Sequence, residues 1–307
     1  MGELKGRIFM TGGSGTLGRA IVNLANENEW DAHFTIYSRD PMRQAKMRNS
    51  IKGNLQFVIG DVRDQNTLRR AMAGHDLVLH LAAMKHIPQA EADPDSCYEI
   101  NVVGSRNVLD AALIHGIKDV VLISTDKACH PINSYGCTKM MMERLGFLYA
   151  ETGINVYMPR YGNVVVSTGS VVTIWKKQLA EGKPLKVTDP YMTRFWLTPE
   201  RAAEIVVESL KYPGVVYVPK LPALSLDKMI EYTLGDPPMD IVGLRPGEKI
   251  HEELMTMEES CYMLDAINAF VIKSPTSERY EPIMNYESCD VPEVSREEMR
   301  RMVGMDD

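Results

Sequence analysis

Along the first half of the chain, short apolar runs rich in β-branched residues alternate with stretches of helical periodicity, and this alternation is the strongest constraint on the fold. The runs that we interpret as strands are residues 7–12, 33–38, 55–61, 76–83, 119–124 and 155–160. Strands that are apolar throughout and separated by helices are typical of a parallel sheet covered on both faces. The sequence therefore predicts a doubly wound α/β domain over residues 1–165.

The longest helix predicted in this half has recognisable ends. Asp93 is a suitable N-cap, and Pro94 suits the first helical position. An apolar stripe then continues as far as Gly116, which ends the helix. We therefore expect one continuous helix between these two positions.

The alternation weakens beyond residue 165. Helices are expected near residues 171–181, 198–211, 225–235 and 246–256, with short strands at 184–189, 215–219 and 269–274. We interpret residues 166–307 as a smaller C-terminal α/β lobe and tail, with some later segments returning to the first sheet. The polar tail from Pro275 is expected to be loosely held.

A glycine-rich string, TGGSGTLG, connects the first predicted strand to the following helix at residues 11–18. Glycine permits a tight turn and lets main-chain N–H groups approach a pyrophosphate at the N-terminus of a helix. A P-loop is a poor match, because Arg19 and Ala20 stand where that motif needs Lys and Ser or Thr. The string predicts a Rossmann-type dinucleotide site. Its expected contacts to the cofactor are Gly12, Ser14, Gly15, Thr16, Leu17 and Gly18.

Basic residues follow the second predicted strand, where enzymes that use NAD usually carry an acidic residue. Ser38, Arg39 and Arg43 offer a hydroxyl and two cations instead, which suits the 2′-phosphate of NADP. The alternative is that these cations only solvate a helix face. Further cofactor contacts are expected after the third and fourth strands, from Asp61, Val62, Ala82 and Ala83.

Two polar motifs lie at and beyond the end of the fifth predicted strand, the edge where α/β sheets carry their chemistry. STDK ends that strand at residues 124–127, and Tyr135 and Lys139 follow with the spacing of one helix face. An ammonium beside a tyrosine favours tyrosinate, so Lys139 and a positively charged nicotinamide are expected to lower the pKa of Tyr135. The pair predicts a base that takes a hydroxyl proton while hydride leaves for nicotinamide.

With these motifs in place, the sequence resembles the extended short-chain dehydrogenase/reductase family. The resemblance is carried by the strings IYSRD, GDVRD, AAMKHIPQAE, STDKACHPINSYGCTK, PRYGNVV, MTRFW and RPGEKIHE. From about Arg7 to Glu259 the chain is similar to the inverting UDP-N-acetylglucosamine 4,6-dehydratases of bacterial surface-sugar pathways. The retaining sugar-nucleotide dehydratases carry Asp-Glu where this chain has Asp126-Lys127. The resemblance implies an enzyme with tightly bound, recycled NADP that removes water from this UDP-sugar and inverts C5.

The resemblance also implies a role for each catalytic residue. Tyr135 and Lys139 assist the oxidation of C4, which makes the C5 proton acidic. Lys127 then removes that proton, Asp126 protonates the departing 6-hydroxyl, and Thr125 belongs to the same catalytic group; hydride returns to C6. We expect Lys139 and oxidised nicotinamide to lower the pKa of Lys127, and Asp126 and Lys127 to titrate as a coupled pair.

For the nucleotide-sugar, the family pattern implies contacts from Lys85, His86, Asn163, Arg194, Arg245 and Glu248. An Arg fork suits the pyrophosphate of UDP. The alternatives are that Arg194 and Arg245 form surface ion pairs and that His86 is a packed loop histidine. The chain departs from the family pattern at Val166, where Gly is usual, and in residues 167–170, where one Arg is missing.

Two other functions stay open. One is a UDP-sugar epimerase acting at C4 or C5 on the same fold, and the other is a non-catalytic NADP-binding sensor. The Asp126-Lys127 pair argues against simple C4 epimerisation, because that reaction needs no residue to move a C5 proton. Tyr135 and Lys139 are both present, which argues against a sensor.

Charge and cysteine content exclude several classes of partner. The chain of 307 residues carries 34 Lys and Arg against 41 Asp and Glu, a formal net charge of −7, and it lacks long basic blocks. Nucleic acids and membranes are therefore not expected partners. Five cysteines without CxxC pairing, and histidines without a ligand spacing, predict a cytoplasmic protein with reduced thiols and no metal site. The resemblance implies a homo-oligomer, a dimer or hexamer, with residues 97–115 and 134–150 at its interface.

Overall fold

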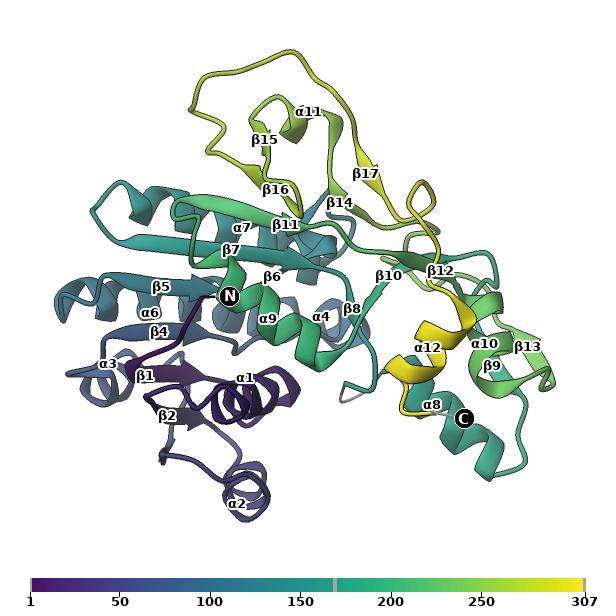
Figure 1. The fold of residues 1–307 in the computed structure, drawn as a ribbon, viewed down its shortest axis with the longest axis horizontal. Helices are drawn as coiled ribbons and strands as arrows, with labels where there is room; N and C mark the ends of the chain where they lie inside the picture. The colour runs from purple at the N-terminus through teal and green to yellow at the C-terminus, as the bar shows by residue number, and fades with distance from the viewer. Residues whose placement is uncertain (1, 168–169, 306–307) are drawn as a thin grey trace.

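The computed structural model describes residues 2–167 and 170–305. In this part of the chain the main sheet has ten strands, in the order β15-β16-β11-β7-β5-β4-β1-β2-β3, with β6 beside β7 (Figure 1). These are β1 Gly6–Thr11, β2 Ala32–Ser38, β3 Leu55–Ile59, β4 Leu77–His80, β5 Asp119–Leu122, β6 Ser124–Thr125, β7 Asn155–Tyr161, β11 Val215–Pro219, β15 Met263–Asp265 and β16 Ala269–Ile272. Neighbours from β3 to β11 are parallel, and β16 and β15 are added antiparallel. The predicted doubly wound α/β fold is confirmed.

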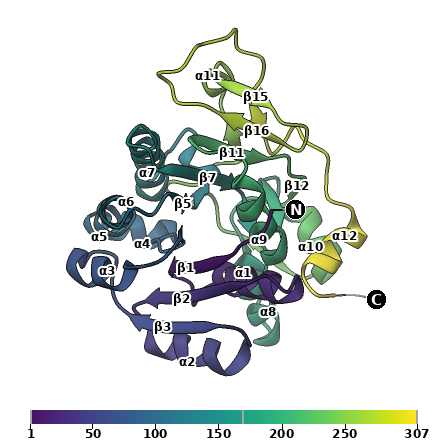
Figure 2. The ribbon, with the colours of Figure 1, turned by 60° about the vertical axis from the view of Figure 1, so that its left-hand side comes forward.

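Helices cover both faces of this sheet (Figure 2). One face carries α1 Thr16–Glu27, α2 Pro41–Ser50 and α9 Pro199–Ser209, and the other carries α3 Gln65–Met72, α6 Gly104–Ile114 and α7 Ser134–Ala150. Ile21 and Val206 are buried in the first layer, and Leu68, Val108 and Met142 are buried in the second. Burial on both faces explains why the strands read as continuous apolar runs.

The helix expected between Asp93 and Gly116 is present and runs without a break as far as Ile114, but one of its turns is irregular. Asp93 does cap its start by accepting a hydrogen bond from the N–H of Ser96 (3.0 Å). The chain then forms α5 Pro94–Tyr98, a π-helical turn at Glu99–Val103, and α6. Asn101 in the π turn bonds both main-chain groups of Met84, at 2.8 and 3.0 Å, and the hydroxyl of Thr138 at 3.0 Å. The extra residue in the turn thus places this buried amide between the end of β4 and α7.

The later part of the chain builds small sheets beside the carboxyl ends of the main strands. β10 Thr193–Leu197 lies between β8 Asn163–Val164 and β12 Ala223–Ser225, and β9 Leu185–Val187 pairs with β13 Met239–Ile241. α8 Val171–Ala180, α10 Leu226–Leu234 and α12 Arg296–Met302 pack around them. Trp175, Met229 and Met299 are buried in this core. Three later strands, β11, β15 and β16, join the main sheet.

The helix predicted over residues 246–256 is wrong. Most of this segment is irregular, and it ends in β14 Glu253–Met255, which pairs with β17 Tyr286–Glu287. The carbonyl oxygens of Lys249 and Ile250 accept hydrogen bonds from the guanidinium of Arg194, at 2.9 and 3.0 Å. The carbonyl of Glu252 accepts from the N–H of Ser288 at 2.9 Å. Carbonyl oxygens that would accept hydrogen bonds within a helix therefore accept them from residues distant in sequence.

Part of the polar tail is held firmly. The Tyr286 side chain is 7% exposed, and its hydroxyl bonds both main-chain groups of Leu221, at 2.7 and 3.0 Å. α12 follows and buries Met299. Two residues of the segment that departs from the family pattern, Thr168 and Gly169, lie outside the described residues. Within the described residues, no helix combines the length and hydrophobicity needed to cross a membrane.

Candidate active site

Glycine-rich residues join β1 to α1 in a turn that side chains would obstruct. Gly12 has φ +66°, and a Cβ on it would lie 2.8 Å from Cα of Ala82. A Cβ on Gly18 would lie 2.1 Å from the carbonyl oxygen of Gly13, so glycine lets α1 pack closely on the loop. Gly15 caps α1 without a side-chain hydrogen bond. The first main-chain N–H groups of α1 are thereby left for an anionic group.

A cavity of about 870 Å³ runs from this turn to the end of β6. Every residue predicted to contact the cofactor lines it, and so do the predicted catalytic residues. The cofactor set is Gly12, Ser14, Gly15, Thr16, Leu17, Gly18, Ser38, Arg39, Arg43, Asp61, Val62, Ala82, Ala83, Tyr135 and Lys139, and the remaining catalytic residues are Thr125, Asp126 and Lys127. Tyr37, Gln89 and Trp196 also line it and were not predicted. The glycine turn, the uncapped helix and the length of the cavity fit an extended dinucleotide.

Ser38, Arg39 and Arg43 gather at one end of the cavity. Ser38 Oγ lies 3.1 Å from Oγ of Ser14 and accepts from the buried amide of Gln44 at 3.0 Å, a contact that sequence reasoning missed. Arg39 and Arg43 keep more than half of their side chains exposed. Each cation faces an acid, Arg39 with Asp61 at 3.6 Å and Arg43 with Asp40 at 3.4 Å, but both remain open to an anion entering from solvent.

Asp61 lies opposite these cations, after β3. Arg63 binds its carboxylate with two hydrogen bonds, at 3.1 and 2.7 Å, and Arg39 approaches to 3.6 Å. Partial burial acts to raise the pKa of Asp61, but the hydrogen bonds and charge of Arg63 hold it below its ordinary value. Asp61 is therefore a stable carboxylate at the rim of the cavity, able to accept hydrogen bonds.

Lys127 is the centre of a compact polar cluster. Its Nζ donates to both carboxylate oxygens of Asp126, at 3.0 and 3.2 Å, and to Oδ1 of Asn163 at 3.3 Å. Glu252 is a second carboxylate at this position, with its Oε1 3.1 Å from the same Nζ. Thr125 donates its hydroxyl to Oδ1 of Asp126 at 2.8 Å. The end of β6 thus joins an ammonium to two buried acids.

The expectation of a lowered pKa for Lys127 is wrong for the protein alone. Burial acts to lower this pKa, but the charges of Asp126 and Glu252 raise it above its ordinary value. Lys139 is not among the charges that shift it, whereas Arg194 opposes the rise. The sequence did not indicate Glu252, because its proximity depends on how residues 246–256 fold. Lys127 therefore rests as an ammonium in this arrangement.

The pKa of Tyr135 also differs from the expected, lowered value. Burial raises its pKa to about 12, and its hydrogen bond with Thr125 and the charge of Lys127 offset this only in part. Lys139 is fully buried one turn later, where burial lowers its pKa to about 8 and Nζ contacts the sulfur of Met142 at 2.9 Å. Without a further positive charge, Tyr135 is a neutral phenol near pH 7.

A buried ion network that the sequence did not predict supports the helix of Tyr135. Arg160 on β7 is 1% exposed and donates to both carboxylate oxygens of Glu143 on α7, at 2.9 and 2.7 Å. It binds Glu259 in the same way, at 2.9 and 2.7 Å. Ser124 donates to Oε1 of Glu143 at 2.5 Å. The network joins the sheet, the helix and α11 Met257–Ser260 beneath the catalytic cluster.

The predicted substrate residues divide into two groups. Lys85, His86 and Asn163 line the cavity, whereas Arg194, Arg245 and Glu248 do not. The pKa values of Lys85 and His86 are both lowered, by burial first and then by nearby cations. In this arrangement only the first group can contact a ligand held in the cavity.

Arg194 is 7% exposed, and its guanidinium is engaged by carbonyl oxygens of the protein itself. Arg245 faces Glu248 at 3.8 Å in a partly exposed ion pair. The alternative of a surface ion pair thus describes Arg245 but not Arg194. In this arrangement the guanidinium of Arg194 is not free to fork a pyrophosphate, whereas that of Arg245 is more than half exposed and lies outside the cavity.

Val166 takes a backbone conformation that favours glycine. Its φ is +54°, which is strained for a β-branched residue, and its side chain is half exposed. The glycine that is usual at this position would adopt this φ freely. Ser167 and Ser170, on either side of the two undescribed residues, line the cavity. The departure from the family pattern therefore lies at the wall of the site.

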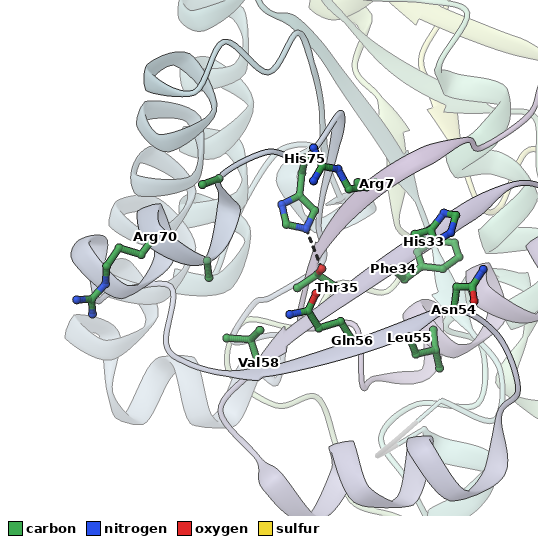
Figure 3. A pocket seen from close by; sticks show the side chains of 12 residues that line it. Arg7, His33, Phe34, Thr35, Asn54, Leu55, Gln56, Val58, Arg70 and His75 are labelled. Carbon is green, nitrogen blue, oxygen red and sulfur yellow. Dashed lines mark hydrogen bonds between the residues drawn. The ribbon is translucent and has the colours of Figure 1, made fainter.

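A second cavity, of about 610 Å³, opens at the other end of the sheet, between α3 and the strands β2 and β3 (Figure 3). His75 points across it and bonds the hydroxyl of Thr35 at 2.8 Å and the carbonyl of Met72 at 2.9 Å. None of the predicted site residues lines it. The first cavity is therefore the candidate active site.

Comparisons with known proteins show which family the chain belongs to. Residues 8–274 match the family described as polysaccharide biosynthesis protein. The chain is 38% identical over 276 residues to a UDP-N-acetylglucosamine 4,6-dehydratase (inverting) of Campylobacter jejuni, a match that covers 86% of this chain and 82% of the relative. It is 34% identical over 279 residues to a UDP-glucose 4-epimerase of Rickettsia bellii, with 86% and 82% covered.

Two solved structures are also similar. Pen from Bacillus thuringiensis superposes with a TM-score of 0.89 and 31% identity, covering 99% of this chain and 98% of that chain. DesIV from Streptomyces venezuelae, a dTDP-glucose 4,6-dehydratase solved with NAD and TYD bound, has a TM-score of 0.72 and 22% identity, covering 80% and 86%. At this lower identity, the second likeness shows the fold alone.

Proposed function

The chain belongs to the family of polysaccharide biosynthesis proteins, and from this premise we propose that it is an NADP-dependent UDP-N-acetylglucosamine 4,6-dehydratase that inverts C5. The observation that carries the proposal is the contact of Lys127 Nζ with the Asp126 carboxylate, 3.0 Å apart at the wall of the cofactor-sized cavity. An amine and an acid side by side can take one proton from C5 and give another to the 6-hydroxyl.

Proton transfer in this scheme belongs to three side chains. Tyr135 takes the proton of the 4-hydroxyl, Lys127 takes the proton of C5, and Asp126 gives its proton to the 6-hydroxyl, which leaves as water. A bound nicotinamide nucleotide supplies the hydride acceptor for oxidation of C4 and the hydride that is returned to C6. C5 then receives a solvent-derived proton on its opposite face, which inverts that centre.

The resting charges of the cluster suit this scheme after one internal transfer. Moving a proton from the Lys127 ammonium to the Asp126 carboxylate gives a neutral amine and a protonated acid without changing the net charge of the pair. The two groups are in hydrogen-bond contact, so the proton can pass directly from one to the other. The pair therefore supplies the base and the acid at once.

The basic end of the cavity supports NADP as the cofactor. Arg39 and Arg43 are exposed beside the Ser38 hydroxyl, and this group of donors matches a 2′-phosphate. At the other end, Lys85, His86 and Asn163 are the cavity residues available to the nucleotide-sugar. The expected homo-oligomer stays a prediction, which light scattering on the purified protein would check.

A UDP-sugar 4-epimerase is the second candidate, and the relatives named UDP-glucose 4-epimerase favour it. Both reactions begin with oxidation at C4. Only dehydration uses a base at C5 and an acid at the 6-hydroxyl, and the Lys127–Asp126 contact is of little use to an epimerase. Loss of water and exchange at C5 therefore separate the two candidates.

The test is incubation of the purified protein with UDP-N-acetylglucosamine in D2O without added cofactor, followed by NMR and mass spectrometry. We expect a 4-keto-6-deoxy product that has lost one water, carries deuterium at C5 and is inverted there. A C4 epimer of unchanged mass without deuterium at C5 would instead establish the epimerase. No reaction, with NADP shown to be bound, would contradict UDP-N-acetylglucosamine as the substrate. A panel of UDP- and dTDP-sugars would then test whether the loop of Val166 selects another sugar.

A further inference from the structure

Glu252 is a buried acid in contact with Lys127, and the sequence motifs gave it no role. It is 2% exposed, and its Oε1 lies 3.1 Å from Nζ of Lys127 and 3.9 Å from Nε of Arg194. Its Oε2 has no hydrogen-bond partner among the described residues. Burying a carboxylate costs free energy unless nearby cations offset it. The cations that do so here are Lys127 and Arg194.

Contacts from distant segments fix the position of Glu252. Its N–H donates to Oγ of Ser288 at 2.9 Å, and its carbonyl accepts from the N–H of Ser288 at 2.9 Å. Ser288 in turn donates to the carbonyl of Thr193 at 3.1 Å. Glu252 is thus held between β10 and the chain after β17, and its carboxylate reaches Lys127 from a different part of the chain than Asp126 does.

The charges around Lys127 come from several elements. Asp126 faces it from the end of β6, Glu252 from the segment before β14, Arg194 from β10 and the phenol of Tyr135 from α7. Asn163 on β8 adds an uncharged acceptor at 3.3 Å. Glu252 is therefore the acid beside Lys127 that the proposed reaction does not consume.

We propose that Glu252 is a positioning residue for the dehydration: its carboxylate holds Nζ of Lys127 beside Asp126 and stabilises the ammonium that forms as Lys127 takes the C5 proton. This inference rests on the proposed function. The proton passes from C5 to Nζ, the proton of Asp126 leaves in water, and Glu252 exchanges none. Its charge lowers the energy of the state that the elimination creates.

The test compares Glu252→Gln, which keeps the shape and the Oε1 acceptor but removes the charge, with the wild type. Deuterium incorporation at C5 is measured across pH. Glu252 acts to raise the pKa of Lys127, so loss of its charge lowers that pKa, and the profile is expected to move to lower pH by about one unit. The maximal rate is expected to fall by about tenfold or more, because the forming ammonium is less stabilised.

Glu253→Gln is the matched control, because Glu253 is adjacent in sequence but binds His130 rather than Lys127. We expect it to keep the position of the profile. Glu252→Asp draws the charge away from Nζ, so it should move the profile in the same direction by less than Glu252→Gln. Thermal unfolding establishes which variants are folded, and if Glu252→Gln is not, Glu252→Asp decides.

The outcomes separate this inference from the proposed function. Wild-type protein that yields no dehydrated product overturns the proposed function and the role of Glu252 with it. If the wild type dehydrates the sugar and the folded Glu252 variants lose rate without any movement of the profile, Glu252 is merely structural and the inference is wrong. A profile that moves to lower pH, with the Glu253→Gln profile unmoved, supports it.

Discussion

At the scale of single residues, Lys127 separates dehydration from epimerisation. In Lys127→Ala, the groups that oxidise C4 are unchanged, but no amine remains to take the C5 proton. We expect the variant to accumulate reduced cofactor, seen as near-ultraviolet absorbance, while deuterium at C5 and loss of water both disappear. Lys220→Ala, which removes a surface ion pair with Asp265, is the control and should behave as the wild type. Full dehydration by Lys127→Ala would remove this residue from the mechanism.

Tyr135 gives a pH-dependent prediction at the same scale. Its pKa is raised to about 12, so the tyrosinate that acts as a base is a minor form below that pH. The rate of C4 oxidation should therefore rise with pH, up to tenfold per unit while tyrosinate stays scarce. Tyr135→Phe should lower that rate by about 10²–10⁴-fold and abolish its rise with pH. Single-turnover absorbance measures both, and equal rates in the two proteins would exclude Tyr135 as the base.

At the scale of elements, the packing of α1 on the glycine-rich turn depends on Gly18. A Cβ there would meet the carbonyl oxygen of Gly13 at 2.1 Å, so Gly18→Ala must push α1 away from the turn. We expect nucleotide binding, followed by calorimetry, to weaken by at least about tenfold, a change of roughly 1.4 kcal/mol. Gly182→Ala is the control: it lies outside the cavity and its Cβ would meet open space, so it adds the strain of a left-handed φ, which Gly18 does not have, without a clash. If both substitutions left nucleotide binding unchanged, the close packing would not matter for the cofactor.

The elements also show where the sequence is informative. The strands and the turn at residues 11–18 depend on local apolar runs and glycines, and the structure confirms their positions. Residues 246–256 carry a helical pattern, yet their carbonyl oxygens accept hydrogen bonds from Arg194 and Ser288. Those partners lie more than thirty residues away, so no local pattern could reveal them. Glu252 was missed for the same reason.

At the scale of the whole molecule, one buried guanidinium joins the parts that carry the site. Arg160 belongs to β7 in the sheet, Glu143 to the helix of Tyr135, and Glu259 to α11, just beyond the segment of Glu252. It also donates to the carbonyl of Leu254 on β14 at 2.9 Å. The active site is therefore assembled by contacts between elements that fold from separate parts of the chain.

Removing this guanidinium should destabilise the protein as a whole. Arg160→Met leaves Glu143 and Glu259 buried without their cation, which we expect to cost about 3–5 kcal/mol of unfolding free energy. Arg160→Met combined with Glu143→Gln and Glu259→Gln should recover part of that loss, because the unpaired charges are gone. Urea unfolding of the three proteins measures both effects. If Arg160→Met were as stable as the wild type, the network would contribute nothing to stability.

The same network also makes the free energy of unfolding depend on pH in the acidic range. Burial acts to raise the pKa of Glu259, but Arg160 and the N–H of Thr256 hold it below its ordinary value of 4.5. Because the folded pKa is the lower one, this stabilisation is fully present above pH 4.5 and is lost as pH falls through the folded value. Arg160→Met removes the cause of the lowered pKa, so its stability should fall less steeply below pH 4.5 than that of the wild type. Unfolding midpoints measured from pH 7 to 3 test this, and parallel profiles would contradict the ion pair as its source.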